Sequence, residues 1–259
     1  MPGEKEVEPL NDDNSVLVLH MTVKKKSDGS IVDTTIEEVG KEAGIEKSLF
    51  LPRTVIVGDL IEELREAVKH LEVGGKTEVE IPPEKAYGEK DESKIIRIPK
   101  KRLLKRGITP KVGTVIEDDK GNRGVITKVT ERFAEIDFNH PLAGETLIYE
   151  IELVKKLEEP ADIVKYLVAD ALYAKPDDLE VVLEEEVAKV FLPPAVLAGI
   201  NEPTSETIRS LVYTAFTKIK KAIEELKGID IIVQIKLVSE KKEEEKEAES
   251  KETKNEEET

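Results

Sequence analysis

The chain has 259 residues, 39% of them hydrophobic and 37% charged, and its formal net charge is −16 at pH 7. The length is enough for one or two domains with a buried core, and so acidic a chain lacks the basic field expected of a nucleic-acid-binding protein. The absence of cysteine excludes disulfides and thiol nucleophiles and favours a reducing, cytoplasmic compartment.

The N-terminal residues 1–15 lack the basic and apolar regions of a signal peptide. No apolar run in the chain approaches the ~20 residues of a membrane span, so no membrane partner is expected. The first predicted element is a strand at residues 16–24 (VLVLHMTVK), which are mostly β-branched or aliphatic. The turn SDGS (27–30) follows it, with Gly29 where a positive φ is favourable.

A second strand and a short helix come next. The segment IVDTT (31–35) continues the β pattern and leads into the helix. Thr35 and Glu38 have the spacing of a capping box, in which each side chain bonds a backbone N–H at the start of a helix. Gly44 then predicts the end of that helix.

Residues 55–75 combine a short strand with an amphipathic helix. The helical spacing gives one apolar face, made of Leu60, Ile61, Leu64, Ala67, Val68 and Leu71. The segments KTEVEIPP (76–83) and AGETLIYEIELVKKL (143–157) alternate between apolar and polar residues, as half-buried strands do. Together these elements predict an α+β domain, with a twisted antiparallel sheet wrapped around one helix.

Residues 89–138 interrupt this domain before its last strand. Within them, IPKKRLLKRG (98–107) is basic with a short apolar pair. Residues 113–138 predict three strands, separated by the turns DDKGN and TERF. A segment of this length with regular structure is not a loop, so we interpret it as an inserted, small, β-rich domain.

A further α+β unit is predicted at residues 160–238. Its pattern gives an amphipathic helix after Pro160, then a hairpin at 178–193. A long helix follows, with an apolar stripe from Ile208 to Leu226, and the unit ends in a strand at 229–238.

The sequence has no pattern typical of a metal or cofactor site. The tail at 239–259 has no large apolar residue, so it is predicted to be a disordered, charged tail. His20, His70 and His140 fall in a strand, a helix and a loop, without the close spacing of zinc ligands. No nucleophile elbow, phosphate loop or dinucleotide fingerprint is present. We therefore expect neither a metal nor a cofactor.

An enzyme built from these residues would have to work without a nucleophile, a metal or a cofactor. Rotation about a prolyl peptide bond is such a reaction, because its barrier of roughly 18–20 kcal/mol arises from amide resonance. A catalyst need only hold the twisted amide better than the planar one. An apolar pocket with a few hydrogen-bonding groups would suffice.

Three segments in register resemble the FKBP-type peptidyl-prolyl cis-trans isomerases: SDGSIVDTT, VIVGDLIEELREAVKHLEVGGKTEVEIPPEKAYG and FNHPLAGETLIYEIELV. The insert between AYG and NHPLAG resembles that of the SlyD-like subgroup, and the whole length resembles the long archaeal members. The resemblance implies an FKBP isomerase domain at 12–88 and 139–157. It also implies an insert-in-flap chaperone domain at 89–138, followed by the α+β domain at 160–238.

The resemblance further implies a catalytic site. Asp33 would be the polar group near the twisted amide, and Ile61 would give its backbone N–H to a substrate carbonyl. Tyr87 would bond a substrate carbonyl through its hydroxyl. The substrate-binding walls and floor of the pocket are implied to be Val32, Leu60, Leu64 and Tyr149.

The sequence departs from the family's pattern at several positions. The first strand carries Thr22 where a tyrosine usually lines the pocket and reaches the aspartate. Leu64 replaces the tryptophan of compact members, as it does in SlyD-like members, and Tyr149 replaces the usual phenylalanine. The segment at residues 41–54 is longer than the corresponding segment of compact members. The tail lacks the histidines and cysteines of a metal-binding SlyD tail, so metal binding is not implied.

Three hypotheses follow for the function. The leading one is a prolyl isomerase with chaperone activity, acting on unfolded or nascent proteins that contain X-Pro bonds. The second is a holdase on an FKBP scaffold with weak or no isomerase activity, which Thr22 favours. The third adds a homodimer formed through the C-terminal domain, since the stripe from Ile208 to Leu226 would serve an interface as well as an internal core.

Overall fold

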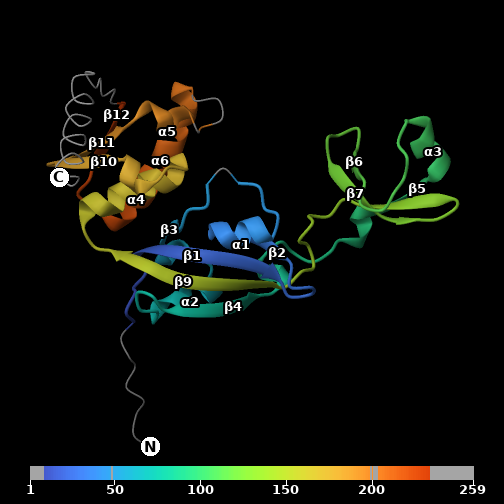
Figure 1. Cartoon of the computed structure of the whole chain (residues 1–259), viewed down its shortest axis with the longest axis horizontal. Coiled ribbons are helices and arrows are strands. Elements are labelled where there is room, and N and C mark those ends of the chain that lie inside the picture. Colours follow the sequence, from blue (N-terminus) through green and yellow to red (C-terminus); the bar gives the residue numbers. More distant parts are fainter. Residues whose placement is uncertain (1–8, 48, 199, 201–203, 234–259) are drawn as a thin grey trace, which may run out of the picture. The chain divides into compact units, whose positions relative to one another are not determined.

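The computed structural model describes residues 9–47, 49–198, 200 and 204–233. The chain divides into two compact units, Met1–Lys156 and Leu157–Thr259 (Figure 1). The first unit contains a five-stranded and a four-stranded sheet, and the second contains a three-stranded sheet. The predicted tail at 239–259 lies outside the described residues.

The five-stranded sheet has the order β2-β1-β9-β4, with β3 paired to β1 (Figure 1). Its strands are β1 (Val16–Lys25), β2 (Ile31–Thr34), β3 (Arg53–Ile56), β4 (Lys76–Ile81) and β9 (Leu147–Leu157). The first half of β1 pairs with β3 and the second half with β2, both antiparallel. Strands β4 and β9 are antiparallel neighbours. The mixed α+β architecture predicted from the sequence is therefore confirmed.

A bulge interrupts the pairing of β1 with β2. Val23 lies opposite Asp33, whereas Lys24 lies opposite Ile31, so Val32 is an extra residue on β2. An extra residue bends its strand and re-aims the side chains beside it. The turn before this strand has Gly29 at a φ of 72°, as predicted.

Helix α2 (Glu62–Lys69) packs on the sheet, and the 3-10 turn η1 (Val57–Asp59) precedes it. Leu64 and Val68 are buried in a cluster with residues of β1, β4 and β9. Ile61 departs from the predicted apolar face, since it is the N-cap residue with extended dihedrals and is 42% exposed.

Asn11 secures the far end of helix α2. The last carbonyls of a helix have no partner within it. The buried amide of Asn11 donates to the carbonyl oxygens of Val68 at 2.7 Å and Leu71 at 3.0 Å. Its backbone N–H also donates to the Lys69 carbonyl at 2.9 Å. This contact between distant segments was not predicted from the sequence.

The capping-box prediction for helix α1 (Glu37–Glu42) is wrong. Ile36, not Thr35, is the N-cap residue, and no side chain caps this end. The Thr35 hydroxyl instead accepts the Met21 N–H at 2.9 Å across the sheet and lies 3.0 Å from His20 Nδ1. Tertiary hydrogen bonds therefore occupy the side chain that the local pattern assigned to the cap.

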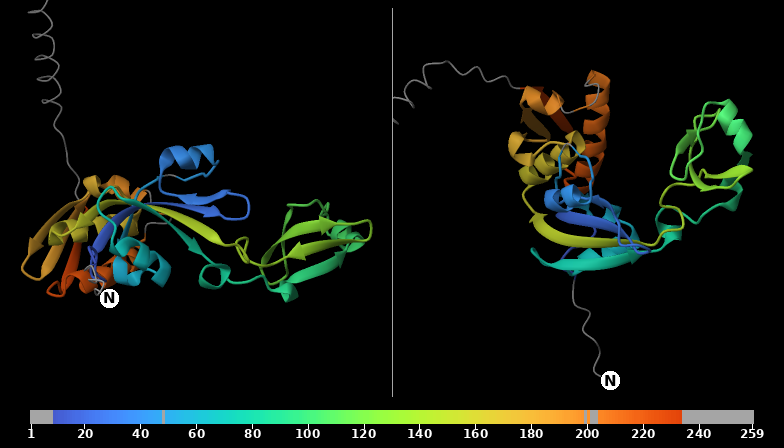
Figure 2. Two further views of the ribbon diagram at one scale, coloured as in Figure 1. Left: turned by 90° about the horizontal axis from the view of Figure 1, so that it is seen from below. Right: turned by 45° about the vertical axis from the view of Figure 1, so that its right-hand side comes forward.

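The four-stranded sheet of the first unit has the order β5-β8-β7-β6, all antiparallel. Its elements are η3 (Glu92–Lys94), β5 (Ile95–Pro99), α3 (Lys100–Lys105), β6 (Val115–Glu117), β7 (Arg123–Val129) and β8 (Phe133–Asp137). The three strands predicted between 113 and 138 are confirmed, while β5 and α3 were not predicted. Helix α3 contacts β5 and β8 (Figure 2), and Leu103 anchors it in this sheet's own core.

The second unit joins helices to a sheet of order β10-β11-β12. Its elements are α4 (Pro160–Leu172), η4 (Pro176–Asp178), β10 (Glu180–Glu184), β11 (Val187–Leu192), α5 (Pro194–Ala198), α6 (Ser205–Ala222) and β12 (Gly228–Val233). The predicted hairpin is β10–β11, and β11 pairs in parallel with β12. The long helix ends at Ala222, so the stripe predicted to reach Leu226 is too long. Residues 234–238 of the predicted last strand lie outside the described residues.

No helix in the described part of the chain is both long and apolar enough to cross a membrane.

Candidate active site

Asp33 lies at the bulged strand β2 with its side chain exposed. One carboxylate oxygen, Oδ1, accepts the backbone N–H of Thr34 at 2.8 Å and also accepts Lys47 Nζ. Lys47 donates in addition to the Thr34 carbonyl at 3.1 Å and lies 5.8 Å from the centre of the Phe50 ring. The loop between α1 and β3, which is long in this sequence, therefore supplies a cation that fixes the Asp33 carboxylate.

Thr22 does not reach this carboxylate through its hydroxyl. The side chain is buried, and its Oγ1 lies 2.9 Å from Oγ1 of Thr34, its cross-strand neighbour. The Asp33 carboxylate thus accepts hydrogen bonds from the Thr34 N–H and from Lys47 rather than from Thr22 of strand β1. Thr22 therefore does not make the contact with the aspartate that the resemblance implies for the usual tyrosine.

Tyr87 follows the 3-10 turn η2 (Pro83–Lys85), after strand β4. The Gly88 N–H donates to the Pro83 carbonyl at 2.7 Å and closes this turn. Lys85 pairs with Glu63, which ties the turn to the first turn of helix α2 and lowers the pKa of the Glu63 carboxyl. The Tyr87 ring is 47% exposed.

His140 stacks on Tyr87 from the other side of the insert. The ring centroids are 4.3 Å apart and the planes differ by 3°. The imidazole is itself held, because its Nδ1 accepts the Leu142 N–H at 3.2 Å. A hydrogen bond also links the segment that leads into the insert to the segment that leaves it. The Gly144 N–H donates to the Gly88 carbonyl at 2.8 Å.

Tyr149 lies on β9 opposite Val79 of β4 and packs partly buried against the core beneath helix α2. Burial raises the pKa of its phenol, and the neighbouring Tyr87 and Asp33 raise it further. A charge acts appreciably only over short distances in a folded protein. Tyr149 therefore lies within electrostatic reach of both Tyr87 and Asp33.

The apolar residues implied for the site lie at the start of helix α2 and on strand β2. Leu60 packs against the buried cluster that contains Leu64, and Val32 is partly buried at the bulge. Among the backbone hydrogen bonds of the described residues, none uses the N–H of the exposed Ile61. That N–H is consequently a free donor at the N-cap of α2.

Tyr149 is thus related electrostatically to residues of two other segments, Asp33 of β2 and Tyr87 after η2. We call Asp33, Tyr87 and Tyr149 the tyrosine–aspartate cluster. Two contributors were missed in the sequence, Lys47 and His140. The surplus length of residues 41–54 was the only signal for Lys47, and the position of His140 next to the insert was the only signal for the stack.

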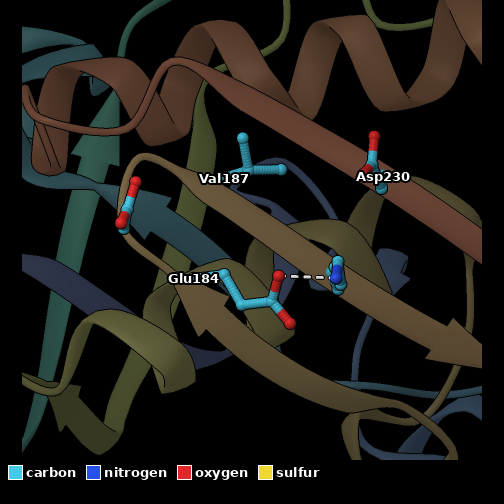
Figure 3. A pocket seen from close by; sticks show the side chains of 5 residues that line it. Glu184, Val187 and Asp230 are labelled. Carbon is cyan, nitrogen blue, oxygen red and sulfur yellow. Dashed lines mark ion pairs between the residues drawn. The ribbon is translucent and has the colours of Figure 1, made fainter.

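A hollow in the second unit offers different chemistry. It has a volume of about 580 Å³ and is lined by Glu184, Glu185, Val187, Lys189 and Asp230 (Figure 3). Glu184 and Lys189 form an ion pair at 2.5 Å. Val187 is the one apolar residue of the five, so this hollow lacks an apolar surface on which a proline ring could pack. In the described ranges, no three His, Cys, Asp or Glu side chains are grouped to hold a metal ion.

Comparison with known sequences identifies a protein family. The model of the family described as FKBP-type peptidyl-prolyl cis-trans isomerase matches residues 9–154. The short-type peptidyl-prolyl cis-trans isomerase of Methanocaldococcus jannaschii is 42% identical over 130 residues, 49% of this chain and 82% of that protein. The FKBP-type isomerase SlyD of Aeromonas hydrophila is 33% identical over 142 residues, 54% of this chain and 61% of that protein. The crystal structure of FkpA from Escherichia coli aligns over 60% of this chain and 45% of its own, with 18% identity and a TM-score of 0.29.

Proposed function

Because the chain belongs to the FKBP-type peptidyl-prolyl cis-trans isomerase family and is an isomerase of SlyD-like type, we propose that it acts on X-Pro bonds of unfolded or partly folded proteins. Residues 12–88 and 139–157 form the isomerase domain of this proposal. Residues 89–138 form a chaperone domain that captures the client, and residues 160–238 form a C-terminal domain.

The catalytic part of the proposal assigns roles to the tyrosine–aspartate cluster and to Ile61. The Ile61 N–H and the Tyr87 hydroxyl hold substrate carbonyls on either side of the proline, while Asp33 lies beside the rotating amide. Val32, Leu60, Leu64 and Tyr149 exclude water from it. Removing water favours the twisted amide, which is less polar than the planar one, over the ground state.

The observation that supports this assignment is that β2, which carries Asp33, and β9, which carries Tyr149, flank the same strand β1, while Tyr87 and Asp33 both raise the pKa of the Tyr149 phenol. These residues come from β9, from the turn after β4 and from β2, and have no reason in the sequence to meet. Tyr149 and Leu60 both pack against the buried cluster that contains Leu64, so the site has polar groups next to an apolar base. That combination suits a prolyl amide, which has an apolar ring and two flanking carbonyls.

Protease-coupled isomerisation of a short prolyl peptide tests the assignment. We expect Asp33→Ala and Tyr87→Phe to lower kcat/KM by at least about tenfold, a loss of ~1.4 kcal/mol of transition-state stabilisation. Asp28→Ala is the matched control, because Asp28 is an exposed aspartate in the turn of the same hairpin and bonds locally to Ser30, whose N–H it accepts at 2.9 Å. Equal rates for Asp33→Ala and Asp28→Ala would remove Asp33 from the mechanism.

The insert at residues 89–138 is the proposed site of client capture. A tethered capture site raises the local concentration of substrate at the isomerase site without new chemistry. Replacing residues 89–138 by a short loop should therefore leave peptide turnover intact while slowing the proline-limited refolding of a whole protein. If the shortened chain catalyses refolding as fast as the intact one, the insert is not a capture domain.

Thr22 favours a second candidate within the same family, a holdase with only weak isomerase activity. Its hydroxyl is engaged with Thr34, so one hydrogen bond to Asp33 that the family usually makes is replaced by the ion pair with Lys47. A peptide rate close to the spontaneous rate, together with suppressed aggregation of an unfolded client, would favour the holdase.

We also propose a homodimer through the C-terminal domain and a cytoplasmic location. Tyr173, Val182 and Tyr213 are exposed large side chains in this domain, and exposed apolar surface favours association. Ala215 and Ile219 of α6 are buried within the described unit, so part of the stripe serves the internal core. A light-scattering mass equal to one chain would exclude the dimer, and cell fractionation tests the location.

A further inference from the structure

The insert has a charge opposite to that of the rest of the chain. Residues 89–138 contain thirteen lysines and arginines against nine aspartates and glutamates, a net charge of +4 within a chain of −16. The remainder of the chain therefore has a net charge of −20. A basic module in so acidic a protein indicates a surface with its own charge preference.

The positive charge is concentrated in one stretch, which we call the basic–apolar segment (residues 100–115). It has six lysines and arginines and no acidic residue. It comprises helix α3, the connection to β6 and the first residue of β6. Of its cations, Arg106 pairs with Asp119 at 3.0 Å. None of the ion pairs among the described residues involves the four on α3: Lys100, Lys101, Arg102 and Lys105.

Large apolar side chains are exposed within the same segment. Leu103 is buried and anchors α3 on the sheet, but its neighbour Leu104 is 51% exposed. Val112 and Val115, further along the segment, are 67% and 61% exposed. Unpaired cations beside exposed aliphatic residues give a surface complementary to a chain that alternates acidic and apolar residues.

We propose that the basic–apolar segment selects unfolded client stretches in which acidic residues lie next to apolar ones, and disfavours basic stretches. This inference rests on the proposed capture function of the insert and names the class of client. The apolar side chains supply contact area, while the cations determine which flanking residues are accepted.

Screening determines whether the local or the global charge decides the preference. At an ionic strength of about 0.15 M the Debye length is about 8 Å, so a client bound on the segment interacts mainly with the cations it touches. The net −20 of the other residues would oppose an acidic client only at much lower ionic strength. Several exposed pairs, each weak, then give a preference of about tenfold at about 0.15 M salt.

The test uses the full-length protein and three short, unstructured, proline-free peptides with identical apolar residues. Their intervening residues are glutamates, lysines or glutamines, and fluorescence anisotropy gives each Kd. We expect the acidic peptide to bind about tenfold more tightly than the basic one, and about 1 M salt to abolish the difference. The variant Lys101→Glu/Lys105→Glu should reverse the preference. Lys120→Glu/Lys128→Glu makes the same charge change outside the segment at exposed positions and should leave the order unchanged.

The outcomes separate this inference from the capture function itself. If none of the three peptides binds, the proposed capture function fails and the inference fails with it. If the glutamine peptide binds but the acidic and basic peptides bind equally well, capture stands and the charge selection is overturned. If single-stranded RNA displaces the acidic peptide at a lower concentration than unlabelled acidic peptide does, the segment is a polyanion site and the proposal is also overturned.

Discussion

The rings of Tyr87 and His140 are stacked, with centroids 4.3 Å apart and planes within 3°. Tyr87 lies two residues before the first residue of the insert, and His140 lies two residues after its last. The exposed Tyr87 phenol, which we propose bonds a substrate carbonyl, thus stacks on a residue in the segment that follows the insert. An aromatic pair of this kind is worth about 0.5–1.5 kcal/mol, which is enough to bias one orientation of an exposed ring.

We predict that His140→Ala lowers kcat/KM for a prolyl peptide by about two- to tenfold, the equivalent of losing that pair. His140→Phe should retain most of the activity, because a phenyl ring can stack on Tyr87 without an imidazole. The two variants also differ from wild type in a second way, since both lose the hydrogen bond from the Leu142 N–H to Nδ1. If phenylalanine is as poor as alanine, that hydrogen bond and not the stack orients the loop.

The ion pair between Lys47 and Asp33 leads to a second prediction. Lys47→Met keeps an aliphatic chain but removes the charge that fixes the carboxylate, and should lower kcat/KM about threefold, while Lys47→Arg should not. Stability should change by less than about 1 kcal/mol, because the pair is partly exposed. Lys41→Met is the control, since Lys41 pairs with Glu37 on α1 at 2.6 Å and not with Asp33. An equal loss in both variants would indicate a general effect of surface charge.

The fold was largely predictable because most of its elements repeat a simple period. Alternation in 76–83 and 143–157 gave β4 and β9, and the apolar stripe of 60–71 gave α2. The failures occurred where tertiary contacts override a local pattern. Thr35 bonds across the sheet instead of capping α1, and the stripe to Leu226 continues past the end of the helix at Ala222.

The candidate site was predictable only through a family resemblance. Period and composition assign Asp33, Tyr87 and Tyr149 to a strand, a turn and a strand, and nothing local indicates that they meet. Lys47 and His140 carry no pattern at all, because their partners lie in other segments and depend on loop conformation. Side-chain contacts made by loops are set by the completed fold and leave no periodic trace.

Tyr149 predicts how stability responds to alkaline pH. Its folded-state pKa is raised above the ordinary value of 10.0 by burial, then by Tyr87 and Asp33. Above pH 10 the unfolded chain therefore loses this proton first and the native state binds more protons. Stability that is complete below pH 10 is then lost as the pH rises through the folded pKa.

Urea denaturation from about pH 8 to about pH 11 measures this effect. We expect Tyr149→Phe to flatten the alkaline decline while keeping isomerase activity, since the family usually has phenylalanine at this position. Tyr173→Phe, at an exposed tyrosine of the second unit, should leave the decline unchanged. An identical decline in wild type and Tyr149→Phe would contradict the assignment of the effect to this phenol.

Gly40 provides a test of how the Lys47 loop is supported. A Cβ at this position of α1 would come within 2.1 Å and 2.5 Å of two atoms of the Phe50 ring, the ring over which Lys47 lies. Gly40→Ala must therefore displace Phe50, and overpacking of this kind costs about 1–3 kcal/mol of stability. Because the loop also carries the partner of Asp33, kcat/KM should fall by about as much as in Lys47→Met.

The double variant Gly40→Ala/Phe50→Leu distinguishes a steric cause from a backbone one. Leucine is smaller than phenylalanine and leaves room for the new methyl group, so the double variant should recover part of the stability lost by Gly40→Ala. Phe50→Leu alone should be less stable than wild type, because it loses buried ring area without any clash to relieve. Such opposite effects of one substitution in two backgrounds are a coupling energy between residues in contact. Additive losses would mean that Gly40 and Phe50 do not touch in solution, and that the loop holding Lys47 is supported by other contacts.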